Sequence, residues 1–193
     1  MSVYSCLDVA GKVVIDIGGN IGDSAIYFAL KGAKKVITVE PHPLAYNIAN
    51  TNVLLNSLES KIIVVNSAIG CENSFVRIDS SKLSVAGELA QDDGNDASTV
   101  VPVRRLKDLI QEYHIDDAVL KMDCEGCEYK VFDESDTSVL RHFSSMVIEY
   151  HHCPDAILSS LTAAGFQAKI PKGQKRIGCK TGILFAWRIN GPE

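Results

Sequence analysis

Short runs of β-branched residues alternate along this chain with helical stretches, and no other feature of the sequence limits the fold as strongly. Residues 12–17 and 35–40 have the composition of buried strands, and residues 23–31 between them have the apolar spacing of a helix. Further strands are expected over 61–69, 117–126, 142–152, 166–170 and 182–190, and further helices over 44–56, 105–114, 127–135 and 155–165. Strands and helices in this order form a mostly parallel sheet with helices on both faces, so we expect an α/β fold.

Length and charge limit the classes of protein to which the chain can belong. With 193 residues, 46% of them hydrophobic, it is long enough for a single globular domain over 1–193 with one sizeable core. Its 19 basic and 24 acidic residues give a net charge of −5, which disfavours nucleic acid as a partner. No apolar run reaches the roughly 18 residues that a membrane helix needs, and the start does not resemble a signal peptide. We therefore expect a cytoplasmic protein without a membrane span.

The six cysteines are expected to be reduced in that compartment and to serve mostly as small buried apolar residues. Cys124 and Cys127 have the spacing of half a zinc site, which His151, His152 or Cys153 could complete. Against this, a glutamate lies within the short knuckle, and the sequence has no second paired motif at the expected spacing. We therefore expect neither a metal nor redox chemistry at these two cysteines.

Polar and acidic residues stand at the carboxyl ends of the expected strands. Open α/β sheets bind their ligands outside this edge. The residues found there are, strand by strand, Asp16 and Gly18, Glu40, Asn66, Asp123 and Glu125, and Glu149 with His151. Asp123 and Glu125 also open a helix, where the helix dipole by itself favours acidic residues. The sequence therefore predicts a crevice rich in carboxylates at one edge of the sheet.

The turn after the first strand, VVIDIGGNIGDSA, indicates which ligand the crevice takes. The dinucleotide fingerprint G-x-G-x-x-G fails here, because Ile17 stands where one register needs glycine, and Asn20 and Asp23 interrupt the other. In the remaining pattern, D-x-G-G-N-x-G, the Asp16 carboxylate suits a cationic ligand better than a pyrophosphate. Glu40 is placed to accept hydrogen bonds from both hydroxyls of a ribose. A ribose joined to a cationic amino-acid tail describes S-adenosylmethionine.

Several blocks of the sequence resemble the FkbM-type methyltransferases, a family of class I S-adenosylmethionine-dependent enzymes. The blocks follow the family's order from Val13 to His151 and read VVIDIGGNIGDSAIYFA, VITVEPHP, NTNVLLN, VVNSAIG, LKMDCEGCEYKVF and VIEYH. The resemblance implies a Rossmann-like class I methyltransferase sheet of seven strands in the order 3-2-1-4-5-7-6, with the last strand antiparallel. It also implies methyl transfer to a hydroxyl oxygen of a small molecule, a sugar or a lipid-linked acceptor.

The same resemblance implies roles for individual residues. The positions that match the family's cofactor-binding motifs are Asp16, Gly18, Asn20 and Gly22 in the loop, Glu40 at the ribose, and Asn66, Ser67 and Ala68 beside the adenine. Asp123, Glu125 and Gly126 would line the floor beneath the reactive methyl group, so that Asp123 faces the cofactor as well as the acceptor. The expected catalytic residues are Asp123, Glu125 and His151, with His151 as the most natural base near neutral pH. Cys124 and Cys127 replace small apolar residues of the family, which implies that they are packing residues.

Two other functions stay open on the sequence alone. One is methylation of RNA or of a base nitrogen, although the N/D-P-P-Y/F motif of amino-methylating enzymes is absent and the charge balance is acidic. The other is a catalytically silent S-adenosylmethionine-binding partner protein. The basic residues of 169–180 could hold an acceptor that carries phosphate or carboxylate, and the polar stretch 87–98 is expected to be a surface loop between two extended segments. The sequence specifies neither the acceptor nor the oligomeric state.

Overall fold

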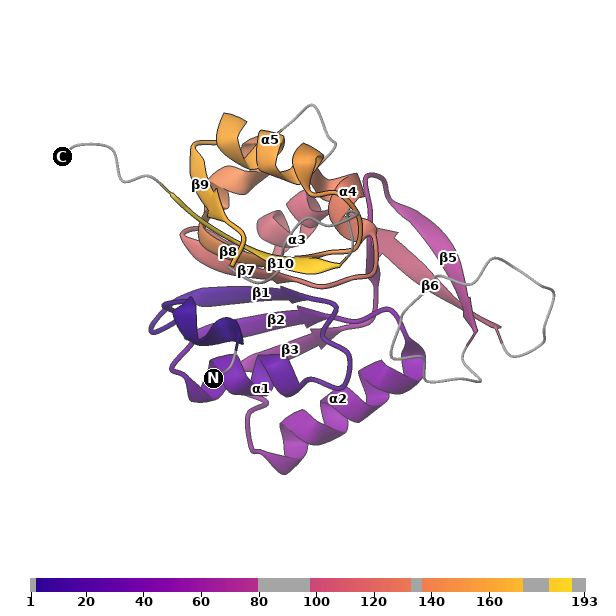
Figure 1. Cartoon of the computed structure of the whole chain (residues 1–193). Helices are drawn as coiled ribbons and strands as arrows, with labels where there is room; N and C mark the ends of the chain where they lie inside the picture. The colour runs from indigo at the N-terminus through magenta and orange to yellow at the C-terminus, as the bar shows by residue number, and fades with distance from the viewer. Residues whose placement is uncertain (1–2, 80–97, 133–136, 172–180, 189–193) are drawn as a thin grey trace.

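The computed structural model describes residues 3–79, 98–132, 137–171 and 181–188, and its centre is a seven-stranded sheet (Figure 1). The strand order is β3-β2-β1-β7-β8-β10-β9. In chain order the strands are β1 Val13–Ile17, β2 Lys35–Val39, β3 Ile62–Val65, β7 Ala118–Met122, β8 Phe143–Tyr150, β9 Phe166–Lys169 and β10 Gly182–Arg188. All neighbours pair in parallel except β10, which runs antiparallel to β8 and β9. The predicted strand order and the antiparallel strand are confirmed.

Helices cover both faces of this sheet, as Figure 1 shows. Helices α1 (Asp23–Leu30) and α2 (Pro43–Leu55) lie on one face, and α3 (Leu106–Glu112), α4 (Cys127–Phe132) and α5 (Asp155–Ala163) lie on the other. Two 3-10 helices span Val3–Cys6 and Thr137–His142. Among the residues that the structure describes, no helix has the length and apolar character needed to cross a membrane.

Alternation along the strands explains why the sheet needs two helical layers. In β1, Val14 belongs to a buried cluster with Phe28 of α1, whereas Ile15 and Ile17 belong to a second cluster with Leu109 of α3. Successive side chains of a strand point to opposite faces, so a strand that is apolar at every position must be covered twice. The burial of all five residues of β7 follows from the same requirement.

One predicted strand is divided in two. Residues 61–69 were expected as one element, but β3 ends at Val65 and the next two paired residues form β4 (Ala68–Ile69). The Asn66 amide donates to the backbone oxygens of Glu40 (2.9 Å) and Pro41 (3.0 Å), which holds the chain at the end of β2 and ends the ladder.

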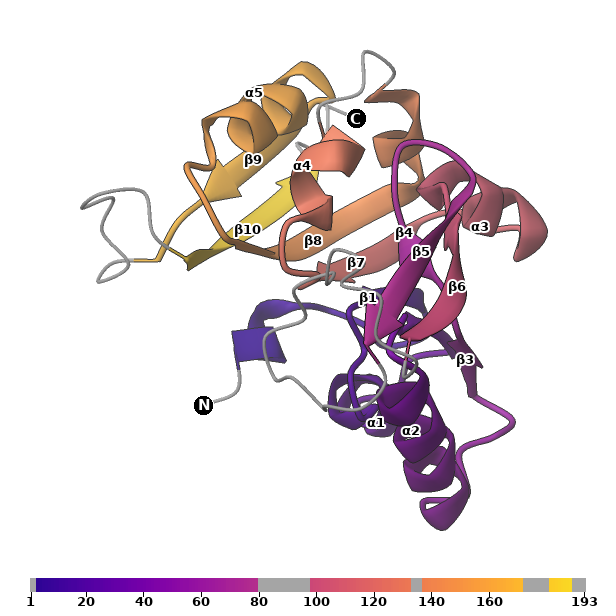
Figure 2. The ribbon, with the colours of Figure 1, turned by 90° about the vertical axis from the view of Figure 1, so that its right-hand side faces the viewer.

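Strand β4 belongs to a separate sheet of order β4-β6-β5, with β5 at Ser74–Asp79 and β6 at Ser98–Arg104. In Figures 1 and 2 the β5–β6 pair extends beyond the carboxyl ends of β1, β2 and β3. Residues 87–97 of the expected surface loop and residues 172–180 of the basic stretch lie outside the described residues.

Candidate functional site

The loop between β1 and α1 lies directly against the residue that follows β7. Gly18 has φ +77°, and a Cβ at this position would lie only 1.6 Å from the backbone oxygen of Asp123. The Asp123 N–H donates to the Ile17 carbonyl at 2.9 Å, and the N–H groups of Gly18 and Gly19 donate to the Val39 carbonyl. Gly18 is therefore required both for its backbone conformation and for the close approach of two chain segments. Two predicted parts of the site, the glycine loop and Asp123, are in direct contact.

The Asp16 carboxylate points into the protein rather than toward the crevice. Asp16 is fully buried, and its Oδ2 accepts hydrogen bonds from Ser24 Oγ (2.7 Å) and Thr38 Oγ1 (3.0 Å). Its Oδ1 lies 3.1 Å from the Nζ of Lys121, which also donates to the Gly18 carbonyl at 2.6 Å. This differs from the expectation that the carboxylate faces a cationic ligand, because Ser24 of α1, Thr38 of β2 and Lys121 of β7 already use it. Asp16 instead shapes the loop that leaves β1.

Lys121 supports the glycine loop, and sequence reasoning proposed no role for it. It is the fourth of the five residues of β7 and is directly opposite Asp16 in the strand register. Burial tends to lower the pKa of Lys121, but the nearby charges of Asp16 and Asp123 outweigh burial and raise it. The available signal was a lysine within the apolar run AVLKM, since a buried charge needs a partner.

Glu40 lies at the carboxyl end of β2 and is 8% exposed. Its Oε2 accepts the N–H of Asn20 and its Oε1 the N–H of His42, each at 2.8 Å. Burial raises the pKa of Glu40, although these two hydrogen bonds and the nearby positive charges act in the opposite direction. Each carboxylate oxygen keeps one further acceptor position, so Glu40 has the capacity to accept from two hydroxyl donors.

The residues that follow β3 are Asn66, Ser67 and Ala68, and the first of them contacts the carboxyl end of β2. Ser67 is fully buried, and in the described part of the chain its Oγ has no hydrogen-bond partner. Ala68, which is 7% exposed, begins β4, and the Asn66 amide supports the backbone of Glu40. Asn66 thus lies beside Glu40, Ser67 and Ala68 follow it in the chain, and the Ser67 hydroxyl still needs a partner.

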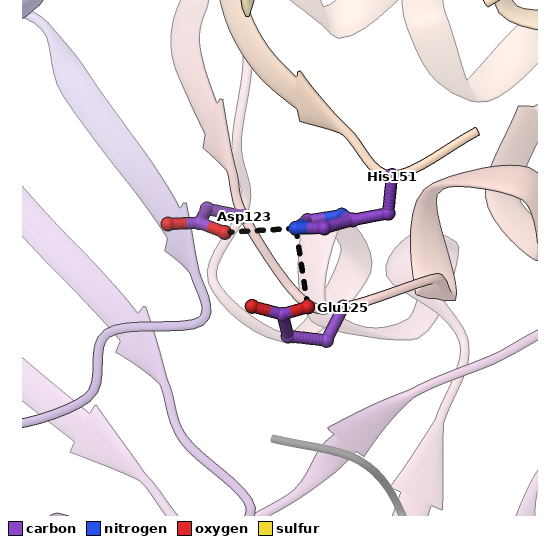
Figure 3. Close-up of side chains that lie close together, drawn as sticks. All are labelled: Asp123, Glu125 and His151. Atoms are coloured by element: carbon purple, nitrogen blue, oxygen red, sulfur yellow. Dashed lines mark ion pairs between the residues drawn. The ribbon is translucent and has the colours of Figure 1, made fainter. Parts of the chain in front are cut away.

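Asp123, Glu125 and His151 come together at the carboxyl ends of β7 and β8, as Figure 3 shows. The Nε2 atom of His151 lies 3.2 Å from Glu125 Oε2 and 3.9 Å from Asp123 Oδ1. The two strands are neighbours in the sheet, so residues 28 positions apart in the chain meet at one edge. The structure therefore brings together the three residues expected to be catalytic.

Glu128 holds the opposite side of the imidazole. It is fully buried, and its Oε1 lies 2.9 Å from His151 Nδ1 and accepts the His151 N–H at 3.1 Å. Its Oε2 accepts the N–H of Gly126 at 2.9 Å. Sequence reasoning assigned Glu128 no role, although it is the last acid of the run DCEGCE in the block LKMDCEGCEYKVF. Its position directs Nε2 of His151 toward Asp123 and Glu125.

The charges of this cluster favour an imidazolium. Burial acts to lower the pKa of His151, but the hydrogen bond and charge of Glu128 and the charges of Glu125 and Asp123 raise it overall. Burial raises the pKa of Glu149 on the same strand, and the charge of Asp123 adds to this effect. A protonated His151 can donate from both ring nitrogens, to Glu128 on one side and Glu125 on the other.

The same three side chains could also hold a cation. Asp123, Glu125 and His151 each offer a ligand atom, and these atoms lie within 4.8 Å of one another. Exposed carboxylates often come this close without an ion, and a shared proton explains the arrangement equally well. The absence of a metal stays a prediction, which removal of divalent ions can test.

The expectation that the cysteines are reduced packing residues is wrong. Cys124 and Cys127 form a disulfide, and Cys153 is also disulfide-bonded, whereas Cys6 and Cys71 are free and exposed rather than buried. Both residues between the first pair have positive φ, +53° at Glu125 and +110° at Gly126. This turn brings the two Cα atoms to 5.5 Å, within the range that a disulfide spans. The spacing alone did not reveal it, because it depends on the unusual backbone at Glu125.

Comparison with known proteins gives one family match and several partial relatives. The family model described as the methyltransferase FkbM domain matches residues 16–168, a range that contains every predicted site residue. A ribosomal protein L11 methyltransferase of Carboxydothermus hydrogenoformans is 42% identical over 57 residues, which are 30% of this chain and 19% of that protein. Methyltransferase sdnD of Sordaria araneosa is 23% identical over 180 residues and is matched over 75% of this chain and 70% of its own. This chain thus spans less than a fifth of the first relative.

Solved structures share the fold at low sequence identity. The methyltransferase FkbM of Methylobacillus flagellatus KT has a TM-score of 0.63 and 18% identity, over 97% of this chain and 47% of that chain. Sp1610 of Streptococcus pneumoniae, described as a candidate tRNA (m1A22) methyltransferase, has a TM-score of 0.54 and 15% identity, over 99% of this chain and 70% of that chain. TrmK of M. capricolum, solved with S-adenosylhomocysteine, has a TM-score of 0.56 and 10% identity, over 94% and 66%. Together they show a class I methyltransferase fold.

Proposed function

Since this chain belongs to the FkbM methyltransferase domain family, we propose that it transfers the methyl group of S-adenosylmethionine to a hydroxyl oxygen of a small molecule, a sugar or a lipid-linked acceptor. The observation that carries the proposal is the contact between Gly18 and Asp123. It joins the glycine loop, where a nucleoside would bind, to the start of the Asp123, Glu125 and His151 cluster. A methyl donor on the loop would lie next to groups that can accept a proton.

The described residues fit S-adenosylmethionine. Glu40 has acceptor positions left for two ribose hydroxyls, and the buried Ser67 hydroxyl, which follows Asn66, has no partner in the described part of the chain. Asp123, which contacts the glycine loop, and Glu125 supply negative charge. This charge would favour a positively charged sulfonium bound next to the loop. When bound, S-adenosylmethionine supplies an electrophilic methyl group on a positively charged sulfur.

Methyl transfer is an in-line displacement, so holding the acceptor oxygen near the methyl carbon, aligned with the breaking bond, is the chief task of the protein. Glu40 and the glycine loop would hold the cofactor, with Asp123 beside the loop, so that its methyl group would face the acceptor hydroxyl near His151. The hydroxyl proton passes to Nε2 of His151. Glu128 keeps Nδ1 protonated and stabilises the resulting imidazolium, as the orienting carboxylate does in other histidine bases.

A methyl-release assay tests the proposal directly. Labelled S-adenosylmethionine would be incubated with the protein and a panel of sugars, lipid-linked precursors and small hydroxyl compounds, with bulk RNA as a competing class of acceptor. Label on a hydroxyl oxygen is the expected result. Label on RNA alone would assign the chain to the nucleic-acid class. Tight S-adenosylhomocysteine binding without transfer to any acceptor would favour a silent binding protein.

Glu40→Ala is expected to weaken S-adenosylhomocysteine binding by about 1.5 to 3 kcal/mol, because it removes a charged acceptor from two ribose hydroxyls. Calorimetric titration of wild type and variant measures the loss. Glu40→Gln is the matched control, since it keeps the shape and one acceptor oxygen and should lose less. Because burial raises the pKa of Glu40, wild-type affinity should also fall on acidification at a higher pH than for an ordinary glutamate. Equal affinity of wild type and Glu40→Ala would remove Glu40 from the ribose site.

The pH dependence of the rate is expected to report the raised pKa of His151. His151 can accept a proton only as a neutral imidazole, so the rate should increase as the pH rises through a pKa above the ordinary imidazole range. The contribution of His151 to the free energy of unfolding changes with pH in the opposite direction. It is fully present below the pKa of an unfolded histidine and is lost as the pH rises through the folded-state pKa.

A rate profile of Glu128→Gln, compared with wild type, tests this assignment. The variant should have its acidic limb at lower pH, because Glu128 is the strongest of the groups that raise the His151 pKa. An unchanged limb would mean that another group titrates.

A further inference from the structure

We propose that the Cys124–Cys127 disulfide is a reversible thiol switch that holds Glu125 beside His151 and thereby sets the activity of the site. The inference rests on the function proposed above and adds a means of regulation to it. It starts from a covalent bond that methyl transfer does not use. This disulfide begins at Cys124, directly after Asp123, and ends at Cys127, the first residue of the helix that carries Glu128.

The disulfide closes a ring of four residues around Glu125. Glu125 is held at φ +53° and Gly126 at φ +110°. The left-handed region is unfavourable for a glutamate, so a glutamate remains there only when its surroundings enforce it. The Gly126 N–H donates to Glu128, but the disulfide is the covalent constraint on the turn. With that bond open, Glu125 is free to leave the left-handed conformation.

Each end of the ring is attached to a different part of the site. Asp123 precedes Cys124 and packs against Gly18 of the glycine loop. Glu128 follows Cys127 and holds the Nδ1 side of His151, while the Glu125 carboxylate lies on the Nε2 side. The position of Glu125 relative to His151 therefore depends on the turn that the disulfide closes.

Cys124 and Cys127 are partly exposed, so a thiol in solution can approach their disulfide. An external dithiol would attack one sulfur through its thiolate and form a mixed disulfide. The second thiol of the reductant then displaces the protein thiol. The protein gains two electrons and two protons as a pair of thiols, and the reductant leaves as a disulfide. No further reactant is needed.

Reduction is expected to lower turnover by about tenfold to a hundredfold, because a catalytic group displaced by about 1 Å has effects of this size. S-adenosylhomocysteine affinity should change little, since Glu40 and the glycine loop lie outside the ring. The imidazole of His151 should also lose part of the stabilisation of its charged form, because the Glu125 carboxylate is no longer held near Nε2.

The test compares oxidised and dithiothreitol-reduced protein by two measurements. One is the methyl-transfer rate. The other is a pH titration of the His151 imidazole by NMR, which needs neither cofactor nor acceptor and therefore works even if the proposed function fails. Reduction should lower the observed pKa of His151 and the rate together. Labelling of free thiols, with Cys6 and Cys71 as the internal standard, confirms the state of each sample.

Variants assign the response to one disulfide. The double variant Cys124→Ala with Cys127→Ala should behave like reduced protein and ignore dithiothreitol. Cys153→Ala is the matched control, since it removes a different disulfide and should keep the full response. In a Glu125→Gln background the His151 titration should no longer depend on the redox state.

An identical His151 titration in oxidised and reduced wild type would overturn the switch, and so would a response that persists in the double variant. If His151 responds but no acceptor is methylated, the proposed function fails and the redox control of the cluster stands.

Discussion

His151→Ala is expected to lower turnover about 10²- to 10⁴-fold while S-adenosylhomocysteine affinity stays nearly unchanged. The His151 side chain is 13% exposed, and Glu128 fixes its Nδ1, so in the neutral ring Nε2 is a preorganised proton acceptor. Loss of the base removes proton transfer in the transition state but leaves Glu40 and the glycine loop in place. Steady-state rates and calorimetric binding on the same preparation separate these effects. The pH–rate profile of the variant should also lack the acidic limb.

Two comparisons make this result specific. His152→Ala alters a neighbouring histidine whose ring packs against the Tyr129 ring, with 5.5 Å between the centroids, and it should keep nearly full activity. Chelation with EDTA should leave the wild-type rate unchanged if a proton, not a metal, joins the three groups. A rate lost to EDTA and restored by a divalent cation would reassign the cluster to metal binding. Full activity of His151→Ala at every pH would leave positioning alone, or Glu125, as the means of activating the hydroxyl.

The convergence of Asp123 and His151 could be predicted because it needs only the strand order. Once β7 and β8 are neighbours, residues that follow them meet at the carboxyl edge, whatever the side-chain packing. The position of Glu40 at the same edge could be predicted in the same way, because it directly follows β2. These predictions use the ends of strands, where an error of one or two residues changes little.

The interactions missed from the sequence depend on register and backbone conformation. Asp16 meets Lys121 only because these two residues are directly opposite in the ladder, and a shift of one residue would place them on opposite faces. Glu128 reaches His151 across 23 residues because α4 begins immediately after the disulfide-closed turn. That turn needs a left-handed glutamate, which no local pattern indicates. Sequence periodicity carries no information on such details.

Lys121→Met is expected to lower the free energy of unfolding by about 3 to 5 kcal/mol, because it leaves the Asp16 carboxylate buried without its charge partner. The side chains of Lys121 and Asp16 are 3% and 0% exposed, so water cannot replace the lost ammonium. The raised pKa of Lys121 means that its contribution is complete at neutral pH and is lost only as the pH rises through the folded-state value. Denaturant unfolding at pH 7 measures the difference.

Lys12→Met is the matched control. Lys12 pairs with Asp117 at 3.2 Å, but these side chains are 27% and 71% exposed, so its removal should lower stability by about 1 kcal/mol or less. Adding Asp16→Asn to Lys121→Met should recover part of the loss, since the uncompensated charge is then removed as well. Lys121→Met should also weaken S-adenosylhomocysteine binding, because the Gly18 carbonyl loses its donor at the start of the glycine loop. If Lys121→Met were no more destabilising than Lys12→Met, the Asp16–Lys121 pair could not be what holds that loop against the sheet.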